Sequence, residues 1–293
     1  MDERDKYIEA GKISATALKK GASLIKINAK LLDVTEAVEK IILDNGGEFT
    51  FPPQISLNEI AAHYCADPDD ETVFKKGDIA KLDCGAMVDG YPGDNATTID
   101  LGDNKKLVDA SRDALNNALD IIKPGITLSE IGRTIQDTIT KAGYAPVKNL
   151  SGHGLSRYKY HDKPSIPNFD TGDQTQLTKG QVIAIEPFAS NGSGMIFETN
   201  VANLFAINKI KPVRNPITRN VLKEIQSFNN MPFTTRWLTK KFHVGKVNFA
   251  LRELLQKNIL NSYPPLPDTQ RGYISQAEHT VIVDDEIIVT TRI

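Results

Sequence analysis

The spacing of apolar residues predicts two similar helices in different parts of the chain. Between residues 33 and 47 apolar residues recur every three or four positions until two glycines end the pattern. Residues 127–143 repeat this spacing and also close with a glycine. Asp33 and Thr127 open the two segments, each with a Glu three residues later, a pattern typical of a capping box.

Strand-like runs also occur, and two of them meet at a predicted tight turn. Residues 79–88 form an apolar run that ends at Asp89-Gly90, and a second run follows at once. Asp-Gly is a strong signal for a two-residue hairpin loop. With that loop Gly85 lies opposite Asp94, so the side chains of Asp83 and Asp94 point to the same face as diagonal neighbours.

This placement of two acids has two interpretations. Like charges held this close destabilise each other unless a proton or a cation lies between them, so the pair is a candidate for metal binding. Antiparallel sheets often have one face in water, and two acids on such a face would give the same pattern. The hairpin alone leaves both interpretations open.

The chain contains a weak copy of itself, which adds a third acid. Residues 75–83 read KKGDIAKLD and residues 178–186 read TKGQVIAIE. When their glycines are aligned, Asp83 falls against Glu186. A shared signature of this length could arise by chance. As a true repeat, it predicts two pseudo-symmetric halves with a site where they join.

Two further segments supply the remaining candidates. Residues 151–161, SGHGLSRYKYH, hold His153 between glycines, which predicts a loop, with His161 eight residues later. Residues 276–283 alternate as a strand that carries Glu278. A lone His or Glu is usually structural, so only the whole set of four carboxylates and one imidazole indicates a metal site. That set suits a pair of divalent first-row metals better than a cysteine-rich zinc site.

Composition narrows the class of protein. Of the 293 residues 40% are hydrophobic and 25% are charged, as in ordinary globular proteins. No apolar run of about 18 residues or more predicts a membrane span, and the charged N-terminal segment lacks the apolar centre of a signal peptide. The two cysteines, Cys65 and Cys84, have no metal-type spacing. They predict free thiols in a reducing cytoplasm.

Taken in order, these motifs resemble a known family. Asp83 and Asp94, then Gly-His153-Gly, Ile-Glu186-Pro and Ala-Glu278-His-Thr resemble the five-ligand signature of the methionine aminopeptidases. The resemblance implies an α+β pita-bread fold of two pseudo-symmetric halves, with an antiparallel sheet and covering helices. It also implies two divalent metal ions, of which Co, Mn, Fe and Zn are all candidates. In that family pattern Asp83 binds one ion, His153 and Glu186 bind the other, and Asp94 and Glu278 bridge both.

The same resemblance implies roles for residues beyond the ligands. The segment FPPQISLNEIAAHY at 51–64 resembles the one that carries a substrate-side histidine, here His63. His63 and His161 would contact the scissile peptide, and Glu186 would accept the proton of the attacking water. Phe51 and Tyr263 are candidates for the methionine pocket, although both could be ordinary core aromatics.

Residues 205–266 form a segment with its own charge. They contain seven Lys and four Arg against two Glu, a formal charge of +9 in a chain of −2 overall. Helical patterns within it predict a small winged-helix-like subdomain, and the resemblance identifies it as the insert of type 2 enzymes of the archaeal kind. The predicted catalytic domain is then 1–204 with 267–293. The insert either walls the cleft or docks on ribosomal RNA.

The function implied by the resemblance is co-translational removal of the N-terminal methionine from nascent polypeptides whose second residue is small. The enzyme would act in the cytoplasm as a monomer. One alternative is a proline-directed peptidase of the same fold, although such enzymes usually carry an additional N-terminal domain. The other is a non-catalytic relative that binds RNA or protein, although such relatives are recognised by lost ligands and this chain keeps all five.

Overall fold

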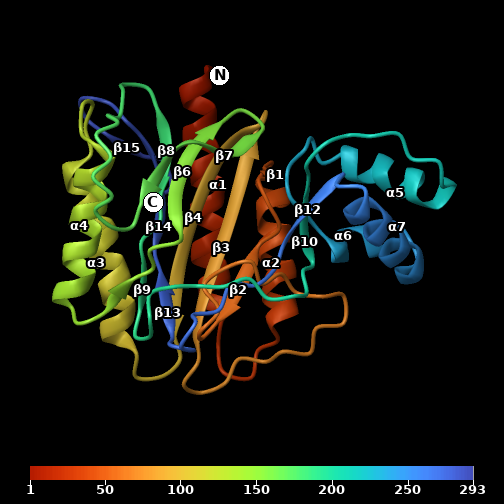
Figure 1. Cartoon of the computed structure of the whole chain (residues 1–293), viewed down its shortest axis with the longest axis horizontal. Coiled ribbons are helices and arrows are strands. Elements are labelled where there is room, and N and C mark those ends of the chain that lie inside the picture. The colour runs from red at the N-terminus through yellow and green to blue at the C-terminus, as the bar shows by residue number, and fades with distance from the viewer. Residues whose placement is uncertain (293) are drawn as a thin grey trace.

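The protein, described here by a computed structural model for residues 1–292, is built on one large antiparallel sheet (Figure 1). Its nine strands are β1 (Glu48–Phe49), β2 (Gln54–Leu57), β3 (Ile79–Val88), β4 (Tyr91–Asp100), β6 (Ser151–Ser156), β7 (Lys159–Pro167), β8 (Val182–Ile185), β14 (Glu278–Ile282) and β15 (Ile288–Val289). The order across the sheet is β1-β3-β4-β14-β8-β6-β7, with β2 paired to β3 and β15 to β14. The predicted antiparallel α+β fold is confirmed.

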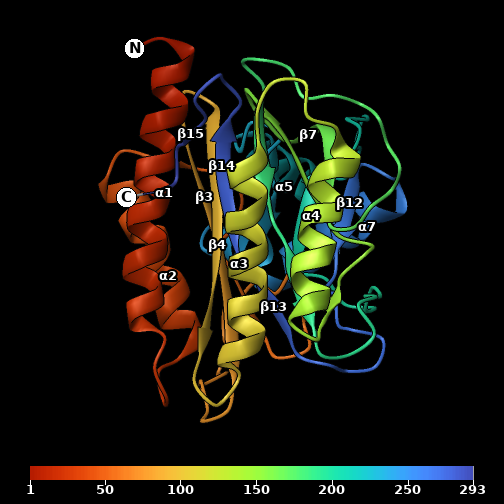
Figure 2. The same ribbon diagram turned by 90° about the vertical axis from the view of Figure 1, so that its left-hand side faces the viewer.

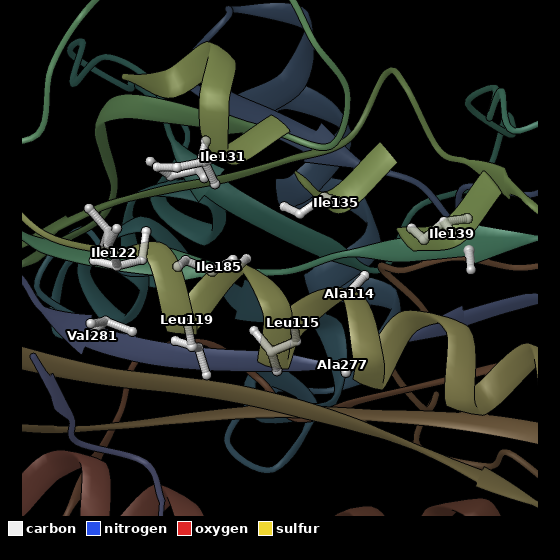
Figure 3. Close-up of a cluster of buried hydrophobic side chains, with 14 of the residues drawn as sticks. Ala114, Leu115, Leu119, Ile122, Ile131, Ile135, Ile139, Ile185, Ala277 and Val281 are labelled. Carbon is white, nitrogen blue, oxygen red and sulfur yellow. The ribbon is translucent and has the colours of Figure 1, made fainter. Parts of the chain in front are cut away.

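Four helices cover one face of this sheet and stand side by side in Figure 2. The first two, α1 (Glu3–Leu24) and α2 (Leu31–Asp44), pack on β3, while α3 (Lys105–Ile121) and α4 (Leu128–Lys141) pack on β8 and β14. Figure 3 shows the apolar core beneath α3 and α4, where isoleucines of α4 and leucines of α3 meet Ile185 and Val281. Because the helices seal one face, the opposite face is left for the site.

The internal repeat is confirmed in detail at the entry to β3 and to β8. Gly77 and Gly180 both have a positive φ, and their amides donate to the far end of the neighbouring strand, to Leu101 O at 2.9 Å and to Val283 O at 2.8 Å. The side chains that close the two turns also correspond. Asp78 accepts from the amide of Lys75, and Gln181 accepts from that of Thr178, each at 2.7 Å.

The hairpin forms as predicted. Val88 pairs with Tyr91 and Gly85 with Asp94, and the two loop residues, Asp89 and Gly90, both have positive φ.

The residues on the helix side of this hairpin are structural. Cys84 is fully buried there, and the hydroxyl of Ser14 in α1 donates to its carbonyl at 2.9 Å. Cys65 is also buried, and both thiols are free, as predicted. Gly93 allows α1 to lie close to β4, because a Cβ at this position would be 2.5 Å from the backbone nitrogen of Gly11.

One predicted helix start is wrong. Thr127 and Glu130 form the expected capping box of α4. By contrast, α2 begins at Leu31 with Lys30 as its N-cap, so Asp33 lies inside the first turn and caps nothing. The reason is a long-range contact. The amide of Leu31 donates to the carbonyl of Thr72 at 2.9 Å, which satisfies the helix end from outside the helix.

Two predictions about the site strands also need correction. His153 lies within β6 and not in a loop. Its flanking glycines serve close strand packing, since a Cβ on Gly152 would be 2.3 Å from Ala184 O and one on Gly154 would be 2.1 Å from Lys163 O. The run predicted as one strand over 276–283 divides at Ala277. Its start belongs to β13 (Ile274–Gln276), which forms a second sheet with β9 (Phe188–Ser190) and β5 (Ala145–Pro146).

The basic segment contains a three-stranded sheet and three helices, at the right of Figure 1. They are β10 (Leu204–Ile207), α5 (Pro216–Gln226), β11 (Phe233–Thr234), α6 (Thr235–Thr239), α7 (Val244–Gln256) and β12 (Leu260–Tyr263). A separate apolar cluster, which includes Val221, Phe233 and Leu254, holds them together. The boundaries 205 and 266 and the winged-helix likeness stay predictions. Within residues 1–292, every helix is too short or too polar to span a membrane.

Candidate active site

The strand register brings three of the predicted ligands together on the open face of the sheet. Ala96 of β4 pairs with Asp83 on one side and with Glu278 of β14 on the other. Asp94 lies two residues before Ala96 and therefore shares its face. The backbone of Asp94 is fixed by Thr280, whose hydroxyl accepts from the Asp94 amide and donates to its carbonyl, both at 2.8 Å.

The other half of the molecule contributes the remaining two predicted ligands, His153 and Glu186. Ala184 of β8 pairs with both His153 and Thr280, and Glu186 follows two residues later, just past the end of β8. The Nε2 atom of His153 lies 3.7 Å from Asp94 Oδ2 and 3.7 Å from Glu186 Oε1. Ligand atoms of Asp94, His153 and Glu278 all lie within 4.8 Å of one another. The site thus forms where the two halves join, as the repeat predicted.

The charges and unpaired oxygen atoms of this cluster favour the binding of cations. Burial raises the pKa of Asp83 to about 7, partly offset by a hydrogen bond from Gln276. Burial, reinforced by the neighbouring carboxylates, raises the pKa of Asp94, Glu186 and Glu278 well above the usual range. The Oδ1 atoms of Asp83 and Asp94 are buried with no hydrogen-bond partner among the described residues. Four carboxylates with open lone pairs fit divalent cations, which supply the missing charge and the missing contacts.

The fifth residue of the cluster, His153, is also suited to binding a metal ion. Burial lowers the pKa of His153 to about 4, so its ring is neutral near pH 7. Its Nδ1 atom lies 3.2 Å from the carbonyl oxygen of Gly154. A carbonyl can only accept, so Nδ1 carries the proton and Nε2, which faces the carboxylates, is free to coordinate a metal.

A cavity of about 230 Å³ opens over the cluster, and His63 forms one of its walls. The His63 backbone has φ of +70°, and Gln54 accepts from its amide at 2.6 Å. Its Nδ1 lies 3.3 Å from Pro264 O, and Tyr263 meets the ring edge-on at 5.7 Å. Burial lowers the pKa of His63 to about 4, although the Pro264 carbonyl acts in the opposite direction. A neutral His63 with Nδ1 protonated leaves Nε2 unprotonated.

His161 and Phe51 line the same cavity from other sides. Tyr160 stacks on His161 with ring centroids 3.8 Å apart and also contacts Phe51 at 5.2 Å. As a whole residue His161 is exposed, but its ring lies against that of His153, with the ring centroids 4.4 Å apart. The main cause that lowers the pKa of His161 is the loss of hydration on burial among these neighbours. The nearby imidazoles of His153 and His63 lower it further. Tyr263 reaches the cavity wall only through His63, so of the two predicted pocket aromatics Phe51 is the one that lines the cavity.

Sequence reasoning missed several residues of the site, namely Gln54, Leu150, Ser151, Tyr160, Gln276 and Thr280. Gln276 donates towards Glu278 at 3.5 Å and Thr280 fixes Asp94. Both lie two residues from Glu278, so the alternation predicted over 276–283 could have identified them, although Gln276 belongs to β13 and Thr280 to β14. Tyr160 has no such signal, because it acts through stacking on a neighbour in the chain.

Such a cluster at the junction of two pseudo-symmetric halves is that of a metal-dependent hydrolase, and comparison with known proteins identifies the family. The profile of metallopeptidase family M24 matches residues 5–210. The chain therefore belongs to metallopeptidase family M24, and within it to the methionine aminopeptidases.

The second assignment comes from curated relatives over nearly the whole chain. The methionine aminopeptidase of Thermococcus onnurineus is 44% identical over 289 residues, 98% of each chain. That of Archaeoglobus fulgidus is 42% identical over 288 residues, 97% of each chain. The crystal structure of the methionine aminopeptidase of Thermotoga maritima covers 99% of this chain and 97% of its own, with a TM-score of 0.74 at 24% identity, a likeness of fold. The reaction is hydrolytic removal of the N-terminal methionine, with divalent metal as cofactor.

Proposed function

We propose that two divalent cations bind the cluster, with Asp83 on one, His153 and Glu186 on the other, and Asp94 and Glu278 shared between them. The observation that carries this assignment is the set of four buried carboxylates with raised pKa values around one neutral imidazole. When bound there, the cations would supply positive charge to polarise the scissile carbonyl and to acidify a water molecule. The identity of the metal is left open by this ligand set, since availability selects it more than ligand type does.

The protein's own groups would then handle protons and orientation. Glu186 accepts the proton of the attacking water, since it lies at the open side of the cluster with 14% of its side chain exposed. His63 and His161 contact the scissile peptide and its developing charge from the walls of the cavity. Gln54 and Pro264 keep His63 in its strained backbone conformation and in one tautomer.

The substrate is an N-terminal methionine followed by a small residue. Phe51 is 2% exposed, and it lines the cavity together with Tyr160 and Phe188, which gives a largely apolar wall for a thioether side chain. A cavity of about 230 Å³ leaves little room for a large second residue once methionine occupies it. Tyr263 supports this wall through its contact with His63.

The basic insert suggests where the reaction takes place. Arg219 and Lys223 lie one turn apart on α5, and Lys246 and Arg252 lie on α7, all of them exposed. The ion pairs of the insert, within the described part of the chain, use other cations. We expect these free cations to contact ribosomal RNA, so that the enzyme acts in the cytoplasm on emerging chains.

The test combines a substrate comparison with one substitution. Wild-type protein given Co, Mn, Fe or Zn should hydrolyse Met-Ala-Ser and leave X-Pro peptides intact; the reverse preference would favour a proline-directed peptidase. Asp94→Asn keeps the volume of the side chain but removes a shared ligand, so activity should be nearly abolished while the circular dichroism spectrum is unchanged. Near-normal turnover of this variant at saturating metal would contradict the assignment.

A further inference from the structure

The insert is joined to the catalytic half through a buried ion pair. Arg236 of α6 is 3% exposed and Glu39 of α2 is 5% exposed. The guanidinium donates through Nη1 to Glu39 Oε2 at 3.0 Å and through Nη2 to Glu39 Oε1. Trp237 donates its indole N–H to the same carboxylate at 2.6 Å and stacks on Phe49 of β1 at 4.8 Å. This bidentate geometry is among the stronger and more directional contacts that proteins make.

Among residues 1–292, the side-chain hydrogen bonds and ion pairs of Glu39 all come from the insert and none from its own half. The apolar stripe of α2, which includes Val34, Val38 and Ile42, faces the sheet. Glu39 points instead at the insert, where Arg236, Trp237 and Lys240 surround it. Apolar residues in place of a buried ion pair are often neutral for stability, so what such a pair adds is a fixed geometry between the parts it joins.

From Arg236 a short rigid path runs through the insert. Helix α6 follows directly on β11, and Leu204 of β10 pairs with Thr234 of β11 on one side and with Tyr263 of β12 on the other. The position of Tyr263 is therefore linked to that of Arg236 by one hydrogen-bonded sheet.

The chain that leaves this sheet holds the segment that carries His63. The Pro264 carbonyl contacts His63 Nδ1 at 3.3 Å, and the Leu266 carbonyl accepts from the amide of Ala61 at 2.8 Å. His63 is in the left-handed region, a conformation that persists only where its surroundings fix it. A shift of the insert relative to α2 would move these contacts.

We propose that Glu39 and Arg236 are positioning residues for the hydrolysis, holding the insert so that Tyr263 and Pro264 keep His63 in place. The proposal rests on the proposed role of His63 at the scissile peptide. Glu39 and Arg236 touch no substrate, and their effect on the rate passes through the insert.

The chain offers its own reporter for the test, because Trp237 is its only tryptophan. Glu39→Gln keeps the size of the side chain and removes its charge. In this variant the tryptophan emission should shift to longer wavelength as the insert loosens. The kcat/KM on Met-Ala-Ser should fall about ten- to a hundredfold, the range for a misplaced catalytic group. Bound metal should be unchanged, as measured on the dialysed protein.

Two comparisons separate positioning from a merely structural role. Glu36→Gln is the matched control, since Glu36 lies on the same helix 3.5 Å from the same guanidinium but is 52% exposed, and it should alter neither emission nor rate. In a His63→Ala background, Glu39→Gln should shift the emission again but cause no further loss of kcat/KM.

Each outcome decides a different point. An emission shift without loss of rate in Glu39→Gln would overturn the positioning role, as would a full additional loss of rate in the His63→Ala background. If His63→Ala alone keeps its rate, the proposed role of His63 fails, while the emission still tells whether the ion pair docks the insert. Absence of Met-Ala-Ser cleavage by wild type would count against the proposed function and leave the docking result standing.

Discussion

Asp83→Asn in the metal-free protein is a perturbation whose sign depends on pH. Burial raises the pKa of Asp83 from 3.8 to about 7 in the folded protein. Below about pH 4 the carboxyl is protonated in both the folded and the unfolded state, so it does not alter the free energy of unfolding. As pH rises towards 7 the unfolded chain ionises first, and the folded state loses stability until both states are ionised.

The size of the effect follows from these two values. The difference of about three pKa units corresponds to about 4 kcal/mol in the free energy of unfolding, at about 1.36 kcal/mol per unit. An asparagine escapes this penalty but leaves a buried amide incompletely paired, which costs about 1–3 kcal/mol. We therefore expect Asp83→Asn to stabilise the chelated protein by about 2 kcal/mol at pH 8 and to destabilise it by about 1–3 kcal/mol at pH 4, where only the cost of the amide remains.

Urea unfolding of both proteins in the presence of a chelator, at pH 4 and pH 8, measures this difference. Asp137→Asn, on the exposed side of α4, is a control in which no gain at pH 8 is expected. With saturating metal the order should reverse, because wild type gains the free energy of metal binding and the variant has lost a ligand. A variant that is destabilised equally at both pH values would refute the raised pKa of the buried Asp83 carboxyl.

Three further outcomes are expected. His63→Ala and His161→Ala should keep their bound metal and lose about one to four powers of ten in rate. His243→Ala, at the exposed start of α7, is the control and should keep its rate. Loss of a metal ion in the His161 variant would make that residue a ligand. Peptides with N-terminal Met should be cleaved about ten- to two-hundredfold faster than those with Leu, and equal rates would contradict an apolar methionine pocket. Gly93→Ala should lower the free energy of unfolding by about 1–3 kcal/mol, because α1 lies too close to β4 for an added methyl group. Gly245→Ala is the control and should not lower it, because a Cβ there meets nothing nearer than 3.4 Å. Equal chemical-denaturation midpoints for the two variants would refute this.

The parts of the site that the sequence predicts correctly are those set by local rules. The Asp-Gly turn and the alternation of side chains are enough to place Asp83 and Asp94 on one face. The shared strand entry relates Glu186 to Asp83 across the two halves, and the matching turns at Gly77 and Gly180 confirm that relation.

What could not be predicted depends on contacts between distant segments. The start of α2 depends on a hydrogen bond to the Thr72 carbonyl, and no pattern in the sequence around residue 31 predicts that contact. Glycines around His153 look like a loop because their reason lies on neighbouring strands. Arg236 counts as one more surface cation in a basic segment until the fold brings Glu39 against it.

The order of strands in the large sheet has a consequence for how the protein is made. Synthesis proceeds from the N-terminus, so β3 with β4, and later β6 with β7 and β8, can pair while the rest of the chain is still being added. These two groups share no strand until residues 278–282 are available, because β14 lies between β4 and β8. Such long-range pairing is slow to form. We therefore expect the growing polypeptide to pass through a stage in which strands of each half are paired but the catalytic centre is absent, and activity to begin only once this late central strand has joined the two groups.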